Sequence, residues 1–458
     1  MRLPGTPSSM KRPTLPPLEI RCPVHGAVPV DAHEAAIVDH PAVQRLRGVR
    51  QLGFSHLPFP GATHTRFSHS LGAMHLAGLA FDSVFRDQPF QSPARMASLR
   101  RCVRLAALCH DLGHAPYSHA AEFAMPPLRD LRIGAYAAER VGPRLDDRAH
   151  HEDYTVAVLV NSDLARAIGA GFDFSAAHVA ALISGEVVVP DDYFIEDGFD
   201  VRGILSQLIS SELDVDRLDY LQRDSLYTGA RYGQIDATWL ISHLARHVDD
   251  AGRVCLALDH RALYALDDFL LARFHMFLMV YFHGKSVVYE EMLKRWVLEP
   301  GAAFALPADV EAYLDTDDAW LWAKLRQSDS AWARRITRYQ PYKVVFEEHG
   351  TAEQTALDHR AAALRSAGID AIPSTAWGSV HAKPNADKVP LYVVGEEGRR
   401  LVEARPVARR LEDISPGRVG KLEGAGICRI YVASDDLEAA RTCLGRVWQQ
   451  PSLLGPRA

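Results

Sequence analysis

The sequence predicts a mainly α-helical core followed by a smaller α+β subdomain. Two observations carry this prediction. From Ala35 to about Trp296 the apolar residues recur mainly at helical spacing, and after about residue 300 short strands and helices alternate. The composition agrees, because 48% of the 458 residues are hydrophobic and 24% are charged, as in packed globular proteins. We therefore expect one large domain and one smaller one.

Three stretches of the core are predicted to be helical from the spacing of their apolar residues. One follows His69, a second leads into His110, and a third runs from Leu263 to Trp296, long enough for one extended or kinked helix. The segment Pro126–Arg148 is rich in Pro, Gly and charged residues and is predicted to be a surface loop. Short β-leaning pieces lie at Val28–Val30, Val187–Val189 and Val254–Leu258.

The C-terminal part alternates between two kinds of element. Its predicted strands are Tyr342–Phe346, Leu391–Val394 and Ile427–Val432, and its predicted helices are Ala352–Ala367 and Asp436–Trp448. We therefore expect three parts in the chain: a Pro-rich flexible N-terminus at residues 1–18, a helical core at residues 19–300 and an α+β subdomain at residues 301–458.

The charge balance argues against a broad polyanion-binding surface. Lys and Arg total 51 and Asp and Glu total 57, which gives a formal net charge of −6. Any contact with nucleic acid would have to be local, and nucleic-acid binding is not expected. No stretch approaches 18 consecutive apolar residues, and the Pro-rich start lacks the apolar segment of a signal peptide. No membrane contact is expected either.

The cysteine pattern indicates a reducing compartment. The six cysteines are scattered and form no CxxC pair, which is typical of buried thiols rather than of a disulfide or zinc framework. The expected location is the cytoplasm.

Histidines are concentrated in the first part of the chain. Of the 21 histidines, 13 lie between His25 and His178. Because His is the commonest metal ligand and titrates near neutral pH, this clustering indicates metal or proton-transfer chemistry. The cations of the same region are arginines, since no Lys lies between Lys11 and Lys285. We attribute this arginine bias mainly to GC-rich coding.

The strongest local signal is the run Leu108-Cys109-His110-Asp111-Leu112-Gly113-His114. An apolar helix here meets adjacent imidazole and carboxylate groups, and the glycine would let the chain turn. Consecutive side chains on a helix diverge by about 100°, so both groups reach one metal only if the helix ends there. An isolated His-Asp pair is more often an ordinary helix end, where His favours the dipole and Asp caps the next turn.

Residues in two other segments favour a metal site. His69 stands at the start of an amphipathic helix, and Asp216 lies in a helix dense in acidic residues. With His110 and Asp111 they would supply two imidazoles and two carboxylates, a mixed set that suits Mn, Fe, Zn or a Mg-like ion. A metal there would acidify a bound water molecule and neutralise a phosphoryl oxygen. A protonated His would donate its proton to the departing ester oxygen. Spacing alone therefore supports a metal-dependent phosphoester hydrolase.

The order of these residues resembles that of the HD-domain phosphohydrolases. Three longer strings are similar to the deoxynucleoside triphosphate (dNTP) triphosphohydrolases, in the branch that contains the eukaryotic sterile-alpha-motif and HD-domain enzyme and its bacterial relatives. They are Phe59–Gly72 (FPGATHTRFSHSLG), His110–His119 (HDLGHAPYSH) and Asp214–Asp224 (DVDRLDYLQRD). The resemblance runs with gaps from about residue 19 to residue 296. It implies an HD-domain core and attack at the α-phosphorus, releasing deoxynucleoside and triphosphate.

The resemblance also implies a role for individual residues. It makes His69, His110, Asp111 and Asp216 the ligands of a divalent metal. It makes His114, His119 and His151 catalytic, with Glu152 orienting His151 for proton transfer. It assigns the triphosphate to Arg66, Arg217, Tyr220, Arg273 and Tyr281, and the sugar to Gln51, Leu52 and Asp224. Relatives often have Lys at the position of Arg217. Both side chains are cations, but the guanidinium of Arg can donate two parallel hydrogen bonds.

The chain departs from the family pattern in two places. Phe277 stands where eukaryotic relatives carry a histidine, so the resemblance predicts no phosphate or base contact at this position. Around Leu18–Cys22 the chain lacks the polar contacts of nucleotide-activated relatives, although Asp39, Gln44 and Arg47 match. A nucleotide activator such as GTP therefore stays an alternative that the residues do not favour. The resemblance further implies a homo-oligomer, either a dimer or a tetramer.

Other readings of the same residues remain open. The chain could be a different HD-domain enzyme, a nucleotidase or phosphodiesterase acting on another nucleotide, or a regulator that binds nucleotide or nucleic acid. His75 points away from His69 by helical spacing and is expected to be a packed or surface residue. Asp214 and Asp219 are expected to serve as helix caps or ion-pair partners, while Asp216, Tyr220 and Asp224 share one helix face.

Overall fold

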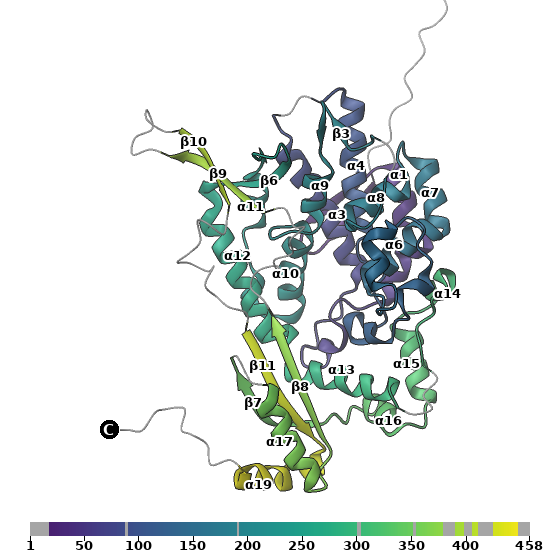
Figure 1. Cartoon of the computed structure of the whole chain (residues 1–458), viewed down its shortest axis with the longest axis vertical. Helices are drawn as coiled ribbons and strands as arrows, with labels where there is room; N and C mark the ends of the chain where they lie inside the picture. Colours follow the sequence, from purple (N-terminus) through teal and green to yellow (C-terminus); the bar gives the residue numbers. More distant parts are fainter. Residues whose placement is uncertain are drawn as a thin grey trace, which may run out of the picture.

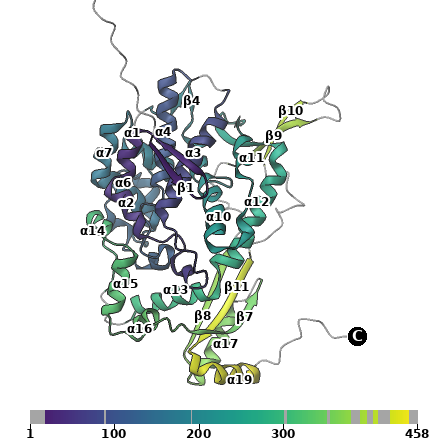
Figure 2. The same cartoon turned by 180° about the vertical axis from the view of Figure 1, so that it is seen from behind.

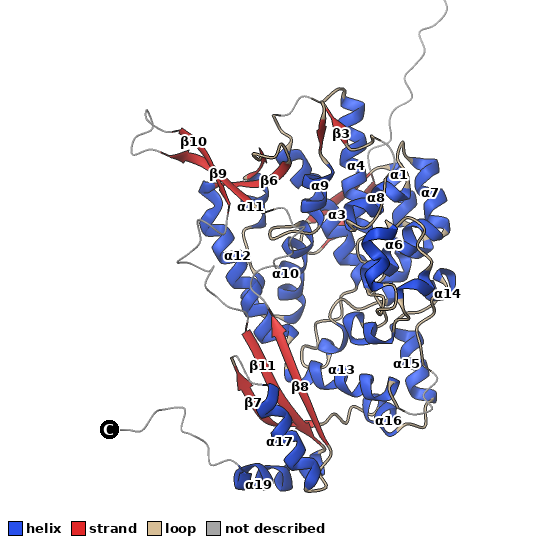
Figure 3. Cartoon of the chain, viewed as in Figure 1, coloured by secondary structure: helices blue, strands red, loops and turns tan. Residues whose placement is uncertain are grey.

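The mainly helical core and the smaller part that contains sheets are both present in a computed structural model of the chain (Figure 3). The structure describes residues 18–87, 90–189, 192–299, 304–350, 354–378, 390–397, 405–410 and 425–447. Apart from Leu18, the predicted Pro-rich N-terminus lies outside these residues. Within them, no helix combines the length and the apolar composition that crossing a bilayer requires.

The first half of the chain folds into packed helices around one large hydrophobic core (Figure 1). The helix α3 (Arg66–Val84) packs against both α4 (Pro93–Cys109) and α10 (Val215–Thr228). Around them lie α1 (Ala32–Val38), α2 (Pro41–Gln44), α6 (His151–Asn161), α7 (Asp163–Gly171), α8 (Ala176–Ile183) and α9 (Arg202–Ile209). The predicted helices after His69 and before His110 are therefore confirmed as α3 and α4.

The ends of these helices follow from local sequence signals. Ser92 caps α4, since its hydroxyl accepts from the Arg95 amide at 3.1 Å, and Pro93 occupies the first turn. Asp214 caps α10 by accepting from the Arg217 amide at 2.9 Å, and Gly229 ends that helix with a left-handed φ of 76°. The capping role expected for Asp214 is therefore confirmed.

Two glycines allow the helices of the core to approach closely. A Cβ on Gly72 of α3 would lie 1.9 Å from Asp219 Oδ1 on α10. A Cβ on Gly113 would lie 2.0 Å from the His151 carbonyl oxygen and 2.3 Å from the Thr155 amide nitrogen on α6. Gly113 is not among the described residues with positive φ. The chain does turn at residues 110–113, as predicted, but glycine is needed at position 113 because α6 packs directly against it.

The predicted run Leu263–Trp296 is a chain of three helical pieces. They are α12 (Leu263–Met276), a π-helical turn η8 (Phe277–Tyr281) and α13 (Gly284–Val297). Single π turns inside helices often lie at functional sites, because they reorient the side chains around them. After α13 come α14 (Val310–Leu314), α15 (Asp318–Gln327) and α16 (Ala331–Thr337), which pack on the same hydrophobic core.

The C-terminal sheet has the order β7-β11-β8 and is antiparallel throughout. Its strands are β7 (Lys343–His349), β8 (Ala371–Gly378) and β11 (Ala425–Val432), and α17 (Gln354–Ser366) and α19 (Leu437–Val447) pack on it in a second apolar cluster. This unit lies at the opposite end of α12 from the β9–β10 hairpin (Figure 1). The strands and helices predicted here are present, although residues 351–353 and Trp448 lie outside the described residues.

One predicted C-terminal strand joins the core instead of the C-terminal sheet. The strand β9 (Tyr392–Glu397) pairs in parallel with β6 (Val254–Asp259), in a sheet of order β10-β9-β6-β5. The other two members are β5 (Leu244–Val248) and β10 (Arg405–Arg410), and α11 (Ala237–Ser242) precedes β5. The sequence could not show this, because strand pairing across more than 130 residues leaves no local pattern.

Short elements complete the fold. The hairpin of β1 (Leu18–Cys22) and β2 (Gly26–Val30) lies against α3, as Figure 2 shows from behind. A second hairpin joins β3 (Ile195–Glu196) to β4 (Phe199–Asp200). The predicted strand Val187–Val189 is reduced to one bridge between Val187 and Tyr136. The predicted loop Pro126–Arg148 contains α5 (Ala138–Val141) and 3₁₀ turns. All six cysteines are free, as expected.

Candidate active site

Three helices bring together the four predicted metal ligands. His69 lies in the first turn of α3, His110 and Asp111 follow the last turn of α4, and Asp216 lies in the first turn of α10. The Nε2 atom of His69 is 3.4 Å from His110 Nε2, 3.0 Å from Asp216 Oδ1 and 3.7 Å from Asp111 Oδ2. The Nε2 atom of His110 is 3.3 Å from Asp111 Oδ1 and 3.4 Å from Asp216 Oδ1.

The separations among His69, His110 and Asp216, which are 3.0–3.4 Å, fit one cation, whereas Asp111 lies slightly farther from His69. Ligand bonds of about 2.1 Å place neighbouring donor atoms about 3.0–3.4 Å apart in octahedral or tetrahedral coordination. The two imidazoles are also oriented for it. His69 Nδ1 lies 2.7 Å from Asp219 Oδ2, and His110 Nδ1 lies 2.8 Å from the Ala107 carbonyl oxygen. When Nδ1–H donates to an oxygen, Nε2 of the same ring keeps its lone pair for a metal. Histidine ligands of metals usually donate their other ring N–H in this way.

The electrostatics of this cluster also favour a cation. Burial would raise the pKa of Asp111, but Arg66, His110 and His114 hold it well below its usual value. Burial would lower the pKa of His69, but its hydrogen bonds with Asp216 and Asp219 raise that pKa to about 10. The carboxylates of Asp111, Asp216 and Asp219 therefore give this cluster negative charge, which a divalent cation would offset. The side chain of Asp216 is 33% exposed, which leaves an approach from solvent.

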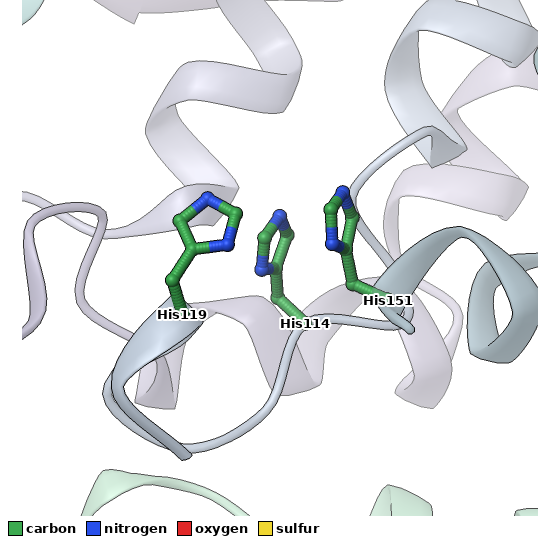
Figure 4. Close-up of side chains that lie close together, drawn as sticks. All are labelled: His114, His119 and His151. Carbon is green, nitrogen blue, oxygen red and sulfur yellow. The ribbon is translucent and has the colours of Figure 1, made fainter. Parts of the chain in front are cut away.

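Beside this cluster lies a row of three histidines from three segments, with their rings side by side (Figure 4). The rings of His114 and His151 stack, with centroids 4.0 Å apart and an angle of 13° between their planes. The ring of His119 stands nearly perpendicular to that of His114, 4.8 Å away. His114 Nε2 lies 3.2 Å from Asp111 Oδ1. His114, which lies between His119 and His151 in the row, is therefore the member that contacts a predicted metal ligand (Figure 4).

The three histidines differ in their preferred charge. Burial, together with the nearby cations Arg66 and His151, lowers the pKa of His114 well below its usual value, so His114 is neutral. Burial would also lower the pKa of His151, but its hydrogen bond with Glu122 outweighs burial and raises that pKa. His151 is therefore the member of the row best suited to carry a proton at neutral pH.

The carboxylate that orients His151 is Glu122, and the expectation for Glu152 was wrong in this respect. Glu122 Oε1 accepts from the His151 amide at 2.9 Å and lies 2.8 Å from His151 Nδ1. Glu122 Oε2 lies 3.0 Å from His119 Nδ1. Glu152 is exposed on α6, since the residue that follows the first helical position turns away from it by about 100°.

Arg66 is a predicted phosphate ligand that contacts the metal cluster directly. Its Nη1 donates to Asp111 Oδ2 at 2.5 Å and its Nε donates to Ser118 Oγ at 2.8 Å. Arg217 Nη1 pairs with Asp214 Oδ2. The guanidinium carbon of Arg273 lies 5.6 Å from the ring centre of Phe277, in the π turn. The position that lacks the histidine of eukaryotic relatives thus packs against one of the expected phosphate ligands.

Tyr220 lies near both the metal cluster and the group around Asp224, one of the residues expected to hold the sugar. Its ring lies 6.5 Å from that of His69 and 6.1 Å from that of Tyr281. The Tyr281 hydroxyl donates to Asp224 Oδ2 at 2.8 Å, and His64 Nε2 lies 2.8 Å from Asp224 Oδ1. Asp216, Tyr220 and Asp224 therefore share one face of α10, as their spacing predicted.

Gln51 and Leu52 lie next to this group through the backbone. The Gln51 amide donates to the His64 carbonyl oxygen at 3.1 Å, and Leu52 packs on the main core. The side-chain oxygen of Gln51 is buried and has no hydrogen-bond partner within the described part of the chain. A buried amide oxygen without a partner is costly, which makes it a candidate acceptor for a ligand hydroxyl.

Asp219 has a larger role than its sequence position suggested. The expected ion-pair role is confirmed, because Arg223 donates to both of its oxygens at 2.7 and 2.8 Å. It also contacts the metal ligand His69, and its other oxygen lies 2.6 Å from His25 Nε2. The helical period could have indicated this contact, because Asp219 follows Asp216 by three residues and so lies on an adjacent face of the same helix.

We expect Asp219→Asn to weaken metal binding. The amide would accept less strongly from His69 Nδ1, and loss of such a second contact typically costs about 10- to 100-fold in metal affinity. Because Arg223 is fully buried, its unpaired charge should also lower the free energy of unfolding by about 3–5 kcal/mol. Mn²⁺ titration and urea denaturation measure the two effects. Loss of stability with unchanged metal affinity would show that Asp219 serves Arg223 alone.

Two family models match the chain over consecutive regions. Residues 66–224 match the HD domain, and residues 235–368 match the HD associated region. The first match begins at Arg66 and ends at Asp224, so it contains all four candidate metal ligands and the row of histidines. The chain therefore contains a region similar to the HD domain, followed by a region similar to the HD associated region.

The similar proteins fall into two groups. An uncharacterised protein of Methanocaldococcus jannaschii is 25% identical over 86% of this chain and 76% of its own length. Deoxynucleoside triphosphate triphosphohydrolases of Dictyostelium discoideum and Homo sapiens are 31% and 29% identical over 58% and 52% of this chain. The aligned part of the chain spans 46% and 37% of the length of these two enzymes.

Two solved structures share the fold over nearly the whole chain. A hypothetical protein from Aquifex aeolicus superposes with a TM-score of 0.70 and 25% identity, covering 93% of this chain and all of that one. A phosphohydrolase from Bacteroides thetaiotaomicron gives a TM-score of 0.64 at 21% identity, covering 91% of this chain and all of that one. At that identity the second likeness concerns the fold alone.

Proposed function

Because the chain carries an HD domain followed by an HD-associated region, we propose that it is a metal-dependent phosphohydrolase acting on deoxynucleoside triphosphates. The observation that carries the proposal is the cluster of His69, His110, Asp111 and Asp216 beside Arg66 and the histidine row. This arrangement combines groups that could hold a cation, a phosphate and a proton within one cluster of side chains. The triphosphate substrate rests on the resemblance of the motifs and on the similarity to two named enzymes.

The metal ligands and the neighbouring cations would hold the phosphates. A divalent cation bound by the four ligands would acidify a water molecule and offset negative charge on a phosphoryl oxygen. Its identity, whether Mn, Fe, Mg or Zn, is left open by a mixed imidazole and carboxylate set. Arg66 would place its guanidinium beside the α-phosphate, because it already contacts Asp111. Arg217, Tyr220 and Arg273 would take the remaining phosphate oxygens, whereas the Tyr281 hydroxyl, also predicted to do so, already donates to Asp224.

His151 would supply the proton for the leaving group. Glu122 favours its protonated form, and a His in that state can donate to the departing O5′ of the nucleoside. His114, neutral and in contact with Asp111, would pass the proton or orient the attacking water. His119 lies on the same row and shares Glu122, with its side chain 66% exposed at the solvent side.

Asp224 and the amide oxygen of Gln51 would recognise the sugar. Tyr281 and His64 hold the Asp224 carboxylate in place. Its remaining lone pairs would accept hydrogen bonds from the sugar. The Gln51 oxygen would accept from a sugar hydroxyl. Leu52 would pack against the sugar ring.

Product identification tests the proposal most simply. The purified protein would be incubated with each dNTP and each ribonucleotide, with Mn²⁺ or Mg²⁺, with and without GTP, and the products separated by ion-exchange chromatography. We expect deoxynucleoside and triphosphate in equal amounts. Formation of monophosphate or free phosphate, or turnover of monophosphates or cyclic nucleotides instead, would contradict the triphosphohydrolase and favour another HD-domain phosphohydrolase. Sedimentation of the same sample would test the expected dimer or tetramer.

We expect Arg273→Ala to discriminate between substrates by their phosphate number. Loss of one charged hydrogen bond to a phosphate should lower kcat/KM for dNTP by about 10- to 100-fold. A monophosphate lacks the outer phosphates that Arg273 would contact, so its turnover should change less than about 3-fold. The matched control is Arg261→Ala just before α12, where the guanidinium pairs with Asp259 and is 65% exposed. Equal losses for both substrates would place Arg273 outside the triphosphate site.

A further inference from the structure

A short segment of the HD-associated region contacts the loop that carries the catalytic histidines. We name residues Tyr313–Asp318 the brace and residues Leu112–His119 the catalytic loop. The brace joins α14 to α15, and it lies about 200 residues further along the chain than the loop. The contacts between them are hydrogen bonds from side chains to the backbone, which fix the course of a loop more closely than apolar packing does.

Asp318 is the central contact of the brace. Its Oδ1 accepts from the Tyr117 amide at 2.6 Å, and its Oδ2 accepts from the Arg50 amide at 3.2 Å. Asp318 is 7% exposed, so this double acceptor is buried. Arg50 Nη1 lies 3.8 Å from the same carboxylate. A single buried side chain therefore ties the catalytic loop to the segment before α3.

The catalytic loop needs such a contact because of its backbone. Tyr117 and Ser118 have φ angles of 57° and 59°, two consecutive left-handed residues of which neither is glycine. Such conformations are costly for residues with a Cβ and persist only where the surroundings enforce them. The Tyr117 ring stacks on Phe54 with centroids 4.4 Å apart, and Asp318 holds its amide.

The left-handed turn places Ser118 where it holds Arg66. Ser118 Oγ accepts from Arg66 Nε at 2.8 Å and donates to the Arg50 carbonyl oxygen at 2.6 Å. Arg50 is thus held at its amide by Asp318 and at its carbonyl by Ser118. Arg66 in turn donates to Asp111. A continuous series of hydrogen bonds runs from the brace to a candidate metal ligand.

Two further contacts fix the other end of the loop. The Tyr313 hydroxyl donates to the Gly113 carbonyl oxygen at 2.7 Å. Arg45, which is buried, donates to the carbonyl oxygens of Leu112, His114 and Thr316 at 3.1, 2.9 and 2.8 Å. Arg45 therefore bridges the catalytic loop and the brace by backbone acceptors on both.

We infer that Asp318 is a positioning residue that fixes Arg66 and the catalytic loop for triphosphate binding, and that the HD-associated region completes the site through it. The role rests on the proposed function, because it assigns Arg66 to a phosphate. Asp318 itself touches neither the metal ligands nor the substrate groups named above. Its effect passes through Tyr117 and Ser118.

The test compares Asp318→Asn with Asp317→Asn. Asparagine offers one acceptor oxygen, so at position 318 it cannot accept from both amides, and its NH₂ would face one of the two donors. At position 317 the side chain caps α15 by accepting from the Trp320 amide at 2.7 Å, a role that asparagine also fills. Both changes lie at the start of the same helix, but only the first removes a contact with the catalytic loop.

We expect Asp318→Asn to act on the loop selectively. Amide hydrogen exchange of peptides within residues 112–119 should rise at least about 10-fold, and the affinity for inorganic tripolyphosphate should fall about 10-fold. Mn²⁺ affinity and exchange in α10 should change by less than about 3-fold. Asp317→Asn should leave all four quantities as in the wild type. If Asp318→Asn fails to fold, Tyr313→Phe removes only the contact with Gly113 and should raise exchange at residues 112–114.

Two outcomes would overturn the inference. One is unchanged exchange and tripolyphosphate affinity in Asp318→Asn. The other is a general loss of stability with no preference for residues 112–119, which would mark a merely structural residue. Failure of the proposed function looks different: the wild type would hydrolyse no dNTP, while the variant would still show selective exchange in the loop.

Discussion

Replacing His110 with alanine should remove both the bound metal and the activity. His110 Nε2 lies within 3.4 Å of three other candidate donor atoms, and its Nδ1 is already committed to the Ala107 carbonyl oxygen. Without it the cation would lose one of two imidazole ligands. Because a catalytic metal supplies several kcal/mol of transition-state stabilisation, turnover should fall by at least about 1,000-fold. Metal analysis of the purified variant and a dNTP turnover assay measure the two effects.

His75→Gln is the matched control for this experiment. His75 lies on α3, six residues after His69, and packs near His25 with ring centroids 5.8 Å apart. Burial and the nearby His25 lower its pKa to about 4, so it is a neutral packed residue, as expected from its spacing. The control should keep its metal and its activity. A His110→Ala protein with full metal content and full turnover would remove the basis of the proposed site.

Replacing His151 with alanine should produce the second largest loss, with the metal retained. Removal of a general acid typically costs about 100- to 10,000-fold in turnover. Glu122→Gln should have a smaller effect that depends on pH. The Glu122 carboxylate raises the pKa of His151, so its removal lowers that pKa and leaves less protonated His at high pH. The alkaline limb of the kcat/KM profile should therefore move to lower pH by about one unit.

Glu152→Gln separates the observed contact from the one expected from the sequence. Glu152 is exposed, whereas Glu122 lies 2.8 Å from His151 Nδ1. The pH profile of Glu152→Gln should match that of the wild type to within about 0.3 pH units, because an exposed carboxylate is screened by water. A shift in Glu152→Gln with none in Glu122→Gln would contradict the assignment of Glu122. Metal content should stay unchanged in His151→Ala, Glu122→Gln and Glu152→Gln.

Local patterns were sufficient to predict the residues that lie on the strongest sequence signals. Helical spacing predicted α3 and α4, and the acid-rich string predicted the face of α10 that carries Asp216, Tyr220 and Asp224. In each case the side chains are placed by one helix, whose period is known in advance. Gly72 leaves room for α10 to pack against α3, and Gly113 leaves room for α6.

The contacts that the sequence could not predict connect segments distant in the chain. Glu122 comes 29 residues before His151, and the intervening residues form short helices and turns whose path has no periodic signal. Asp318 follows Tyr117 by 201 residues. Glu152 was an attractive partner for His151 because it is the next residue, but helix geometry points consecutive side chains apart. Partner choice across such distances depends on tertiary packing.

The fate of the water oxygen tests the central claim most directly. The protein would hydrolyse a dNTP in water enriched in oxygen-18, with His110→Ala as the inactive control, and the products would be analysed by mass spectrometry. Attack at the α-phosphorus breaks the bond to O5′, so one labelled oxygen should appear in the triphosphate and none in the deoxynucleoside. Label in a nucleoside monophosphate or in pyrophosphate, or label in the deoxynucleoside, would contradict the proposed reaction.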